Sequence, residues 1–393
     1  MDPAELRELL STEGLRLLDE LPQQASTGDI VRTVSDLRKA GHSPGLVAAV
    51  LAQAKLRSRA VAKFGPFAER MLFTPAGLEQ ATRLPVAAQH AGRFLRADIG
   101  WVADLGCGIG ADALAIAALD IEVTAVERDE VTAAIAAYNL APWSNARVEH
   151  ADAETVDLSG VGGVFLDPAR RDGATRLKHP GDWSPSLDFA FGVAERLPTG
   201  IKLGPGIDRD LIPERAEAQW ISADHEVVEL GLWFGPLARE GVRRAALVLG
   251  DHGAAEMVAA ADSADADAGA LGEFLYEPDG AVIRARLIGD LARELGGRML
   301  DPTIAYITAD TATTTPFAAG FRVLEDFPLD KRTLKRALAA RGIGALEIKK
   351  RGVDIDPQVF RTELNLAGEA SATLVLTRIG GKRRALLAER LQP

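Results

Sequence analysis

The spacing of apolar residues divides the chain into regions of different pattern. Over residues 1–97, apolar side chains recur at intervals of three and four positions, as in AELRELLSTEGLRLLDEL, and this spacing predicts amphipathic helices. From Trp101 onward, short apolar runs alternate with helical stretches. Such alternation predicts parallel strands joined by crossover helices. We therefore expect a doubly wound α/β domain over residues 98–250, preceded by a helical region.

The sheet of this domain is expected to have seven strands and to be mostly parallel. Its apolar runs are WVADLG, IEVTAVE, ARVEHAD, VGGVFLD, IKLG, EVVELGLWF and RRAALVLG. Only the short segment GPLAREGV separates the last two runs. Because so short a connection suits antiparallel neighbours, these two strands are expected to form a hairpin at one edge of the sheet.

The rest of the chain predicts small α+β domains. Residues 251–318 are interpreted as a linker and a small mixed unit, because His252 to Glu273 is rich in Ala, Asp and Gly and is typical of a flexible acidic loop. Residues 319–393 are expected to form a basic domain with the order strand, helix, strand, helix, hairpin. Gly380-Gly381 predicts the two-residue turn of that hairpin.

The composition is that of a globular protein of two or three domains, with 393 residues of which 47% are hydrophobic and 26% charged. No apolar run reaches the roughly 20 residues of a membrane helix, and the N-terminal stretch reads as an acidic-capped amphipathic helix rather than a signal peptide. Cys107 is the only cysteine, which excludes an internal disulfide and a multi-cysteine metal site. We expect a cytoplasmic protein without a membrane or metal partner, and the sequence predicts no oligomeric state.

Charge is distributed unevenly along the chain. The formal net charge of −11 argues against nucleic acid as a partner. However, the segment from Lys331 to Pro393 holds 14 Lys or Arg and 6 Asp or Glu, a net of +8, while the remaining residues carry −19. This asymmetry indicates a basic module attached to an acidic body.

A glycine-rich run, DLGCGIGADALAIA, follows the first predicted strand and opens a helix at residues 104–117. Gly106, Gly108 and Gly110 remove side chains where the backbone turns sharply and lies against a ligand, and the helix start presents free N–H groups. Asp104 is placed to accept hydrogen bonds from a ligand's amino group or from loop amides. Taken alone, the run also fits a tight strand-to-helix turn that binds nothing.

Acidic residues close the next three strands as well. Glu127 lies 23 residues after Asp104, where a carboxylate can accept the hydroxyls of a ribose. Asp152 can accept from an adenine amino group, or it can cap a helix before Glu154. Asp167 ends the fourth strand. Since ligands of open parallel sheets bind beyond the carboxyl ends of the strands, these acids predict one shared crevice.

Two cofactors are compatible with the glycine pattern. The residues from Gly108 to Ala113 also fit the dinucleotide fingerprint G-x-G-x-x-A. An acid as close as Asp104 would repel a pyrophosphate, however, whereas S-adenosylmethionine has no phosphate and carries positive charge on its sulfonium and amino groups. The acidic surroundings favour the second cofactor.

These motifs resemble those of the class I S-adenosylmethionine-dependent methyltransferases, over Trp101 to about Leu249. DLGCGIG is similar to their first motif, Glu127 to the second, Asp152 to the third and LDPARR to the fourth. The resemblance implies S-adenosyl-L-methionine as cofactor. It also implies a set of cofactor-binding residues: Asp104, Gly106, Cys107, Gly108, Gly110, Glu127, Arg128, Asp152, Ala153 and Thr74. Thr74 is included because such enzymes cover the methionine end with residues upstream of the first strand; its neighbour Phe73 fits core packing equally well.

Nearly the whole chain is similar to bacterial methyltransferases that have a C-terminal THUMP-like domain and an intervening ferredoxin-like domain. The stretches that carry this likeness are FAERMLFTPAGLEQAT, FLDPARRDGATRLKHPGDWSPSL, KLGPGID, YEPDGAVIRA and LEIKKRG. Because THUMP domains occur on RNA-modifying enzymes, the resemblance implies RNA modification of rRNA or tRNA. This implication rests on association, since a fold does not determine function.

The fourth motif is similar to the Asp-Pro-Pro-Tyr motif of enzymes that methylate amino groups of bases. In those enzymes the acid and a backbone carbonyl orient the target amine, which implies catalytic roles for Asp167, Pro168 and Arg170. No aromatic residue follows here, and Arg170 and Arg171 could instead hold phosphate or be solvated. A route through carbon 5 of uridine needs a nucleophilic cysteine, and Cys107 lies in the cofactor loop.

Short basic runs follow in the C-terminal segment. Together with Arg171, the candidate substrate-binding residues are Lys349, Lys350, Arg351, Lys382 and Arg383. A solvated face that offsets the acidic body explains the same residues. The leading hypothesis is an RNA methyltransferase, and the alternatives are a methyltransferase acting on a protein or small molecule and a non-catalytic binding protein.

Overall fold

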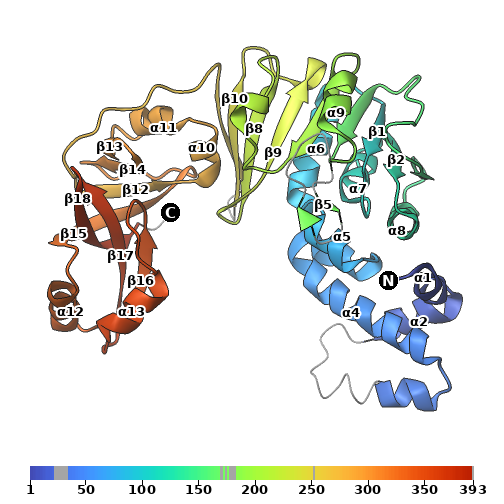
Figure 1. Cartoon of the computed structure of the whole chain (residues 1–393), viewed down its shortest axis with the longest axis horizontal. Coiled ribbons are helices and arrows are strands. Elements are labelled where there is room, and N and C mark those ends of the chain that lie inside the picture. Colours follow the sequence, from blue (N-terminus) through green and yellow to red (C-terminus); the bar gives the residue numbers. More distant parts are fainter. Residues whose placement is uncertain (22–33, 169–170, 173–174, 177–182, 251–252, 392–393) are drawn as a thin grey trace. The chain divides into compact units, whose positions relative to one another are not determined.

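The computed structural model describes residues 1–21, 34–168, 171–172, 175–176, 183–250 and 253–391; side chains between 169 and 182 lie outside this description (Figure 1). The chain divides into two compact units. The first contains Met1–Leu203 and Gly231–Arg239, and the second contains Gly204–Leu230 and Glu240–Pro393. No helix in these described ranges is long and apolar enough to cross a membrane.

The N-terminal region is helical, as the spacing of its apolar residues predicts. Its helices are α1 (Pro3–Leu9), α2 (Thr12–Glu20), α4 (Pro44–Phe64), η1 (Gly65–Arg70), α5 (Pro75–Gln80) and α6 (Leu84–Arg96). Polar N-cap side chains begin α1, α2 and α4 at Asp2, Ser11 and Ser43, because each accepts a hydrogen bond from a backbone N–H of the first turn. Buried faces of α1, α2 and α4 join the core that continues under the glycine-rich loop.

The first sheet confirms the doubly wound α/β architecture. Among the described residues it has the strand order β11-β10-β8-β9-β7-β4-β1-β2-β3. Its members are β1 (Trp101–Leu105), β2 (Glu122–Glu127), β3 (Ala146–His150), β4 (Gly163–Leu166), β7 (Thr199–Leu203), β8 (Glu217–Ala223), β9 (Glu226–Phe234), β10 (Arg244–Gly250) and β11 (Gly253–Ala259). The pairs β1–β2, β1–β4, β2–β3 and β4–β7 are parallel. The short ribbon of β5 (Arg171–Asp172) and β6 (Thr175–Arg176) follows β4.

Helices α7 (Ala111–Ala117), α8 (Glu130–Leu140) and α9 (Leu187–Ala194) connect these strands. The chain runs outward from β1 through β2 to β3 and then places β4 on the other side of β1. The strand order therefore reverses between β1 and β4. In a doubly wound sheet this is the position of the ligand crevice.

The edge beyond β7 differs from the expectation. β8 lies between β9 and β10, so the predicted hairpin of the last two apolar runs was wrong. β10 instead pairs parallel with β8 and antiparallel with β11. The expectation of a loop over His252 to Glu273 was also wrong for Gly253–Ala259, because pairing with β10 orders this Ala-rich segment as a strand. The sheet thus has two more strands than expected.

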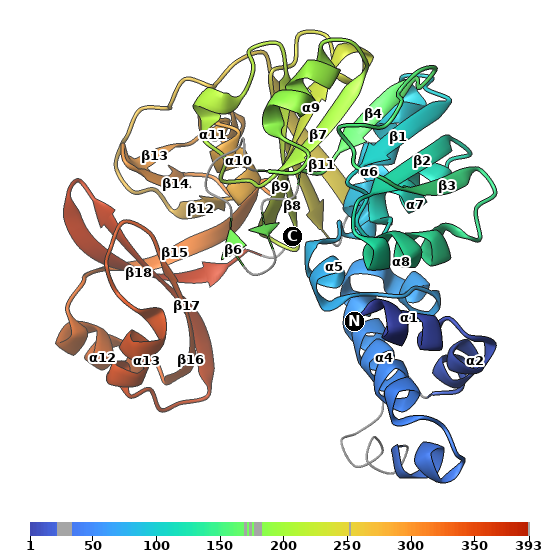
Figure 2. The ribbon, with the colours of Figure 1, turned by 45° about the vertical axis from the view of Figure 1, so that its right-hand side comes forward.

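A seven-stranded sheet forms most of the second unit, in the order β13-β14-β12-β15-β18-β17-β16. Its strands are β12 (Phe274–Pro278), β13 (Arg298–Asp301), β14 (Ile304–Ala309), β15 (Ala318–Pro328), β16 (Ile343–Lys350), β17 (Ala370–Ile379) and β18 (Lys382–Arg390), and its helices are α10 (Gly280–Arg284), α11 (Ile288–Glu294), α12 (Lys331–Ala340) and α13 (Pro357–Leu364). α12 and α13 pack on the face of β16–β18 that carries Leu346, Leu376 and Leu387 (Figure 2).

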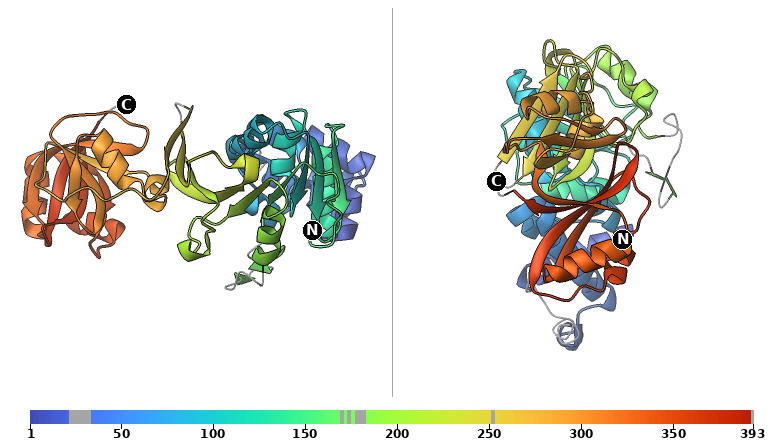
Figure 3. Two further views of the ribbon diagram at one scale, coloured as in Figure 1. Left: turned by 90° about the horizontal axis from the view of Figure 1, so that it is seen from above. Right: turned by 90° about the vertical axis from the view of Figure 1, so that its left-hand side faces the viewer.

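The opposite face of this sheet curls onto itself. Arg378 Nη2 donates to Thr303 Oγ1 at 3.0 Å, and Arg351 Nη1 donates to the Ala305 carbonyl at 3.2 Å, so the β13–β14 edge meets β16 and β17. Leu275, Tyr306, Phe321 and other apolar residues are buried inside the curl. Figure 3 shows the sheet from two further directions.

The predicted C-terminal hairpin is confirmed. β17 and β18 pair antiparallel with Ile379 opposite Lys382, and Gly380 and Gly381 both have positive φ, +53° and +76°. The four-segment division at residues 97, 250 and 318 stays a prediction. The seven-stranded sheet runs through residue 318 without interruption, because β12 pairs directly with β15.

Candidate active site

Four parallel strands bring acidic residues to one edge of the first sheet. Asp104 is the last residue but one of β1, and Glu127 ends β2. Asp152 follows β3, and Asp167 follows β4. The carboxyl ends of parallel neighbours lie together, so these acids surround the reversal point between β1 and β4.

The glycine-rich loop is held against β2, and its first glycine lies close to the fourth motif. The amides of Gly106 and Cys107 donate to the Val126 carbonyl at 2.9 and 3.0 Å. Gly106 has φ +83°, and a Cβ added there would lie 3.1 Å from the Asp167 carbonyl oxygen. Because of this close approach, the loop and the start of the fourth motif are in direct contact. Gly110, with φ +85°, begins α7.

Asp104 is a buried acid with exceptional surroundings. Its exposed fraction is 1%, and no side chain of the described residues donates to its carboxyl oxygens. Burial raises the pKa of Asp104 well above its ordinary value, and the neighbouring carboxylates of Asp112 and Asp167 raise it further. The Lys202 ammonium and the backbone N–H of Ala113 offset this only in part. A buried carboxyl group with so little support from the protein is suited to a ligand that brings its own donor or positive charge.

Glu127 connects the second strand to the glycine loop. Its Oε2 accepts from the Gly108 N–H at 3.1 Å and its Oε1 accepts from the Asp129 N–H at 2.9 Å. Burial raises the pKa of Glu127 although these amides lower it. Each oxygen keeps a further lone pair, so hydroxyl groups of a ligand can still donate to this carboxylate.

Asp152 and Arg128 have local partners. Asp152 Oδ1 accepts from the Glu154 N–H at 2.9 Å, so it caps a turn and not a helix, because no helix begins at Glu154. Arg128 Nη1 donates to Ser184 Oγ at 3.0 Å, and the Glu154 side chain accepts from the Ser186 N–H at 2.7 Å. The segment from Trp183 to Ser186 is thereby tied to the edge where β2 and β3 end.

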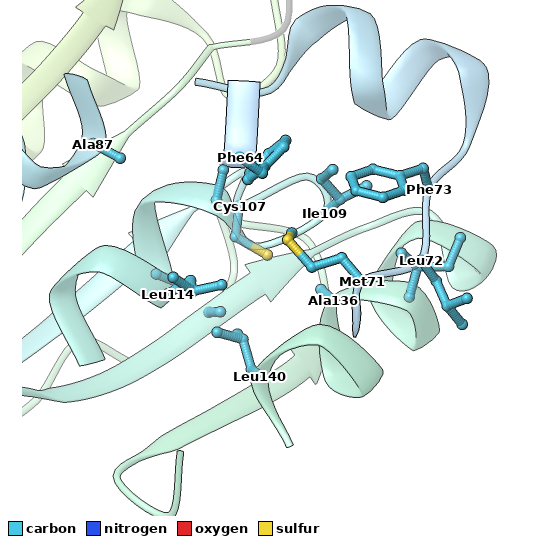
Figure 4. Packing of buried hydrophobic residues seen from close by; sticks show 14 of the residues in the cluster. Phe64, Met71, Leu72, Phe73, Ala87, Cys107, Ile109, Leu114, Ala136 and Leu140 are labelled. Carbon is cyan, nitrogen blue, oxygen red and sulfur yellow. The ribbon is translucent and has the colours of Figure 1, made fainter. Parts of the chain in front are cut away.

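Cys107 belongs to the core rather than to the crevice. Its side chain points into a cluster with Phe64, Met71 and Ile109 (Figure 4). Burial, followed by the charges of Asp104 and Glu127, raises the pKa of the thiol well above its ordinary value, so it is a poor nucleophile. Ala153 is buried as well.

Thr74 caps a helix that packs on the glycine loop. Its Oγ1 accepts from the Gly77 N–H at 2.9 Å and begins α5. A Cβ added to Gly77 would lie 2.5 Å from the Ile109 side chain, so the first turn of α5 touches the loop. The neighbouring Phe73 is fully buried, as core packing predicts.

Polar side chains from other helices hold the segment before α5 in place. Gln53 of α4 forms two hydrogen bonds with the backbone of Phe73, at 2.6 and 3.0 Å. Asn139 of α8 bonds both the N–H and the carbonyl of Leu72, and its amide also donates to the Ile109 carbonyl at 2.9 Å. Gln53 and Asn139 therefore join the helical region to the glycine loop. We call residues 71–81 the cover segment.

Lys63, near the end of α4, holds the other end of the cover segment. Its Nζ donates to the carbonyls of Leu78, Glu79 and Ala81 at 2.7–2.9 Å, where α5 ends. Burial lowers the pKa of Lys63 to about 8, with smaller contributions from the positive charges of Lys202 and Arg83.

Asp167 forms an ion pair with the adjacent strand. Lys202 Nζ lies 2.6 Å from Asp167 Oδ2 and donates to Thr82 Oγ1 at 2.9 Å. Thr82 donates in turn to Asp112 Oδ2 at 2.6 Å, and His90 Nδ1 lies 2.8 Å from Asp112 Oδ1. Burial acts to raise the pKa of Asp112, but the hydrogen bond and charge of His90, with Lys202 and Thr82, lower it overall.

The rest of the fourth motif is described only in part. Pro168 is buried. Arg170 lies outside the described residues, and of Arg171 the structure gives the backbone pairing with Arg176 but not the side chain. Their predicted contacts with substrate stay predictions. No group of residues able to hold a metal ion occurs in the part of the chain that the structure describes.

The basic residues of the C-terminal segment fall into two groups. Lys349 and Arg351 lie at the curled face of the second sheet, where Lys349 Nζ is 2.6 Å from Glu277 Oε2 and Arg351 is 3.8 Å from Glu277 Oε1. Lys349 is also 3.6 Å from Glu347 Oε1, so both cations already have carboxylate partners in the protein. Lys350, Lys382 and Arg383 are exposed.

Comparison with known proteins places this architecture in a family. The chain is 36% identical over 335 residues to an uncharacterized S-adenosylmethionine-dependent methyltransferase found in two strains of Mycobacterium tuberculosis, which covers 83% of this chain and 91% of that protein. The chain belongs to the S-adenosylmethionine-dependent methyltransferases. The solved structure of a Porphyromonas gingivalis protein described as a methyltransferase matches over 100% of both chains, with a TM-score of 0.73 and 21% identity. That similarity confirms the fold.

Two family models match parts of this methyltransferase. A THUMP domain-like family matches residues 318–390, and a domain of unknown function matches residues 2–60. The resemblance stated from the sequence is thereby confirmed for the methyltransferase and for its C-terminal segment.

The groups at the reversal point of the sheet suit S-adenosylmethionine. The cofactor carries a sulfonium and an ammonium group, and Asp104 offers a buried carboxyl group to which no side chain of the described residues donates. At Gly106 the positive φ and the 3.1 Å approach of a Cβ to the Asp167 carbonyl oxygen both favour glycine. Acidic residues with no lysine or arginine in the loop match a cationic, phosphate-free ligand.

Sequence reasoning missed Gln53, Lys63, Thr82, His90, Asp112 and Asn139, and included Lys202 only as the first residue of the stretch KLGPGID. Gln53 and Asn139 were detectable as polar residues within apolar helices. Asp112 looked like an ordinary acid in the first turn of a helix, which the helix dipole favours anyway. The partnership of Lys202 with Thr82 spans 120 positions of sequence and has no local signal.

Proposed function

We propose that this methyltransferase modifies RNA, and that the positive end of its THUMP-like segment holds the substrate. The observation that carries the proposal is a set of exposed cations at one end of the second sheet. Lys382 lies opposite Ile379 and Lys350 lies opposite Leu376, while the Leu329 N–H bonds the Arg383 carbonyl where α12 is about to begin. Phosphate groups of RNA are the natural partners for such cations.

The cofactor residues are proposed from their placement. Asp104 would accept from the ammonium group of S-adenosylmethionine, Glu127 from its ribose hydroxyls and Asp152 from its adenine. The glycines Gly106, Gly108 and Gly110 keep the loop clear for it. When bound, the cofactor supplies an electrophilic methyl group on a sulfonium sulfur, which becomes a neutral thioether once the acceptor atom bonds the methyl carbon.

Asp167 and its carbonyl are proposed to orient the acceptor. The carboxylate stands at the end of β4, and its carbonyl oxygen faces Gly106 of the loop. Both are acceptors and therefore suit an N–H donor such as a base amino group, whose lone pair would then be aimed at the cofactor. The buried Pro168 stiffens the backbone at this point. A cytoplasmic location stays a prediction from the sequence.

Mass spectrometry of nucleosides tests the substrate class. RNA from cells that lack the gene should lose one methylated nucleoside, and the wild-type gene should restore it. The Asp167→Asn variant should bind S-adenosylmethionine in calorimetry but fail to restore the nucleoside. An unchanged set of RNA nucleosides, with methyl transfer to a protein or small molecule instead, would refute the RNA proposal.

Calorimetry tests the cofactor site separately. Asp104→Ala and Glu127→Ala should each weaken binding of S-adenosylmethionine by about tenfold or more, because each removes a charged hydrogen-bond acceptor. Asp188→Ala, which changes an exposed carboxylate on α9, is the control and should bind as the wild type does. Unchanged affinity in both site variants would contradict the placement of the cofactor.

A further inference from the structure

The register of β4 and β7 places Lys202 next to Asp167, the acid that is proposed to orient the methyl acceptor. β4 and β7 pair parallel with Leu166 opposite Ile201. One residue further along, Asp167 and Lys202 are neighbours whose side chains leave the sheet on the same side. The backbones of two central strands therefore set the 2.6 Å contact between Lys202 Nζ and Asp167 Oδ2.

A series of hydrogen bonds through Thr82, Asp112 and His90 holds the ammonium group of Lys202 in place. Thr82 uses its hydroxyl proton for Asp112 Oδ2, so its lone pair is left for Lys202 Nζ. Asp112 is held through its other oxygen by His90. Thr82, His90 and Asp112 are all buried, with exposed fractions of 6% or less. The ammonium group thus has a rigid support that begins in α6 and α7.

We propose that Lys202 is a positioning residue for methyl transfer, which holds the Asp167 carboxylate in one orientation beside the glycine loop. The proposal rests on the proposed role of Asp167. The side chain of Lys202 is 13% exposed and that of Asp167 is 34% exposed, so the buried cation is the fixed partner and the acid faces the open side. An ionised carboxylate has about four acceptor positions, and the bond through Oδ2 leaves others for a substrate N–H.

Lys202 also allows several acids to share a small region. Asp104 from β1 is repelled by Asp112 and by Asp167, and Lys202 favours the charged forms of Asp104 and Asp112. His90 from α6 is hydrogen-bonded to Asp112 and lowers its pKa, and Lys63 from α4 lies close enough to Lys202 for mutual repulsion.

Titration of the full-length protein tests the contact without any substrate. Carbon-13 NMR of aspartate carboxyl groups follows Asp167, whose signal is identified by its absence in Asp167→Asn. Lys202→Met should raise the pKa of Asp167 by about one pH unit or more, and Lys202→Arg should restore most of the wild-type value. Lys55→Met, which removes an exposed lysine of α4, is the control. An unchanged pKa in Lys202→Met would overturn the proposal.

Methyl transfer to RNA from cells lacking the gene tests the consequence. Lys202→Met should lower kcat about tenfold or more at pH 6, while the KM for S-adenosylmethionine stays within about twofold. Lys202→Arg should recover part of the rate, because it restores a cation beside Asp167. A merely structural role would raise the KM for S-adenosylmethionine together with the loss of kcat and would give no rescue by Lys202→Arg, and this outcome would overturn the proposal.

The two proposals can fail separately. If Asp167→Asn methylates RNA like the wild type, the proposed function of Asp167 is wrong, whatever Lys202 does. If Asp167→Asn is inactive while Lys202→Met has wild-type kcat and pH profile, only the positioning role of Lys202 is wrong.

Discussion

At the scale of single residues, the candidate site depends on groups that would be unfavourable in an ordinary core. Asp104 has a buried carboxyl group to which no side chain of the described residues donates, and this costs stability in the protein alone. Gly106 has a backbone conformation that residues with a side chain rarely adopt, so this position favours glycine. A bound cofactor that donates to Asp104 would supply the missing partner.

The buried acid predicts an unusual pH dependence of stability. Asp104 has a raised pKa in the folded protein, so between the ordinary pKa near 4 and that raised value the folded state binds more protons than the unfolded chain. Stability from this group is therefore complete at low pH and is lost as the pH rises. The Asp104→Asn variant lacks this carboxyl group and does not lose this stability as the pH rises. The difference between its melting temperature and that of the wild type should therefore increase from pH 4 to pH 8. Asp188→Asn is the control, and a difference that stays constant with pH would contradict the prediction.

The Gly106→Ala substitution tests the backbone geometry of the glycine loop without changing the charge of the site. Alanine there would have to adopt φ +83° and place its Cβ 3.1 Å from the Asp167 carbonyl oxygen. A left-handed conformation costs about 1–2 kcal/mol for an L-residue, so Gly106→Ala should weaken binding of S-adenosylmethionine by about tenfold in calorimetry. Gly100→Ala adds the same methyl group in open space, where φ is ordinary, and should bind normally. Equal affinities in the two variants would show that the loop tolerates the change.

At the scale of elements, sequence reasoning succeeded where pattern and local chemistry agree. The strands β1 to β4, the helix after the glycine loop and the Gly380-Gly381 hairpin all have local signals. β8 was missed because Glu217, Gln219 and Ser222 interrupt its apolar run, although the whole strand is buried. β11 was missed because an Ala-rich segment becomes a strand only by pairing with β10.

The same contrast holds within the candidate site. The acids at the strand ends were recognised because each follows an apolar run in sequence. Of the cover segment, only Thr74 was named as a cofactor-binding residue, from the resemblance. The placement of the segment was not predictable, because side chains of α4 and α8 that are distant in sequence set it. No local sequence pattern predicts which backbone group a distant glutamine will bond. The acids at the strand ends were therefore predictable, and the side chains that hold the cover segment were not.

Helix α4 is therefore expected to affect cofactor binding from outside the sheet. Gln53→Leu would leave the buried N–H and carbonyl of Phe73 without partners, at a cost of about 1–3 kcal/mol for each group. The variant should melt at a lower temperature and bind S-adenosylmethionine more weakly. Arg59→Leu, at an exposed position of the same helix, should match the wild type in both measurements. Normal cofactor affinity in a destabilised Gln53→Leu protein would limit the role of α4 to stability.

At the scale of the whole molecule, the chain does not separate into segments that can be removed one by one. It passes from the first unit to the second at residues 203–204, returns at 230–231 and leaves again at 239–240. Within the second unit, β18 lies between β15 and β17. Deleting the residues from Lys331 onward would remove three strands and open the core that contains Phe321 and Tyr306. Substrate binding is therefore better tested with surface charges than with truncations.

Charge reversal at the exposed end of the second sheet tests RNA binding in the intact protein. The triple variant Lys350→Glu, Lys382→Glu, Arg383→Glu should bind a mixed-sequence single-stranded RNA more weakly than the wild type. It should also reduce the slope of log affinity against log salt concentration by about 2, because each lost phosphate contact removes about 0.7 from the slope. Lys349→Met should change affinity little, since Lys349 is already paired with Glu277.

The matched control has the same change in net charge at another place. Lys39→Glu, Lys55→Glu, Arg59→Glu reverses three exposed cations of the N-terminal region. If RNA were attracted only by overall charge, both triple variants would lose affinity equally, because nonspecific attraction depends on the summed field. If the end of the second sheet contacts the RNA backbone, only the first variant should lose salt dependence. Fluorescence anisotropy across a salt series distinguishes the two outcomes, and equal slopes in both variants would contradict a substrate site on the THUMP-like segment.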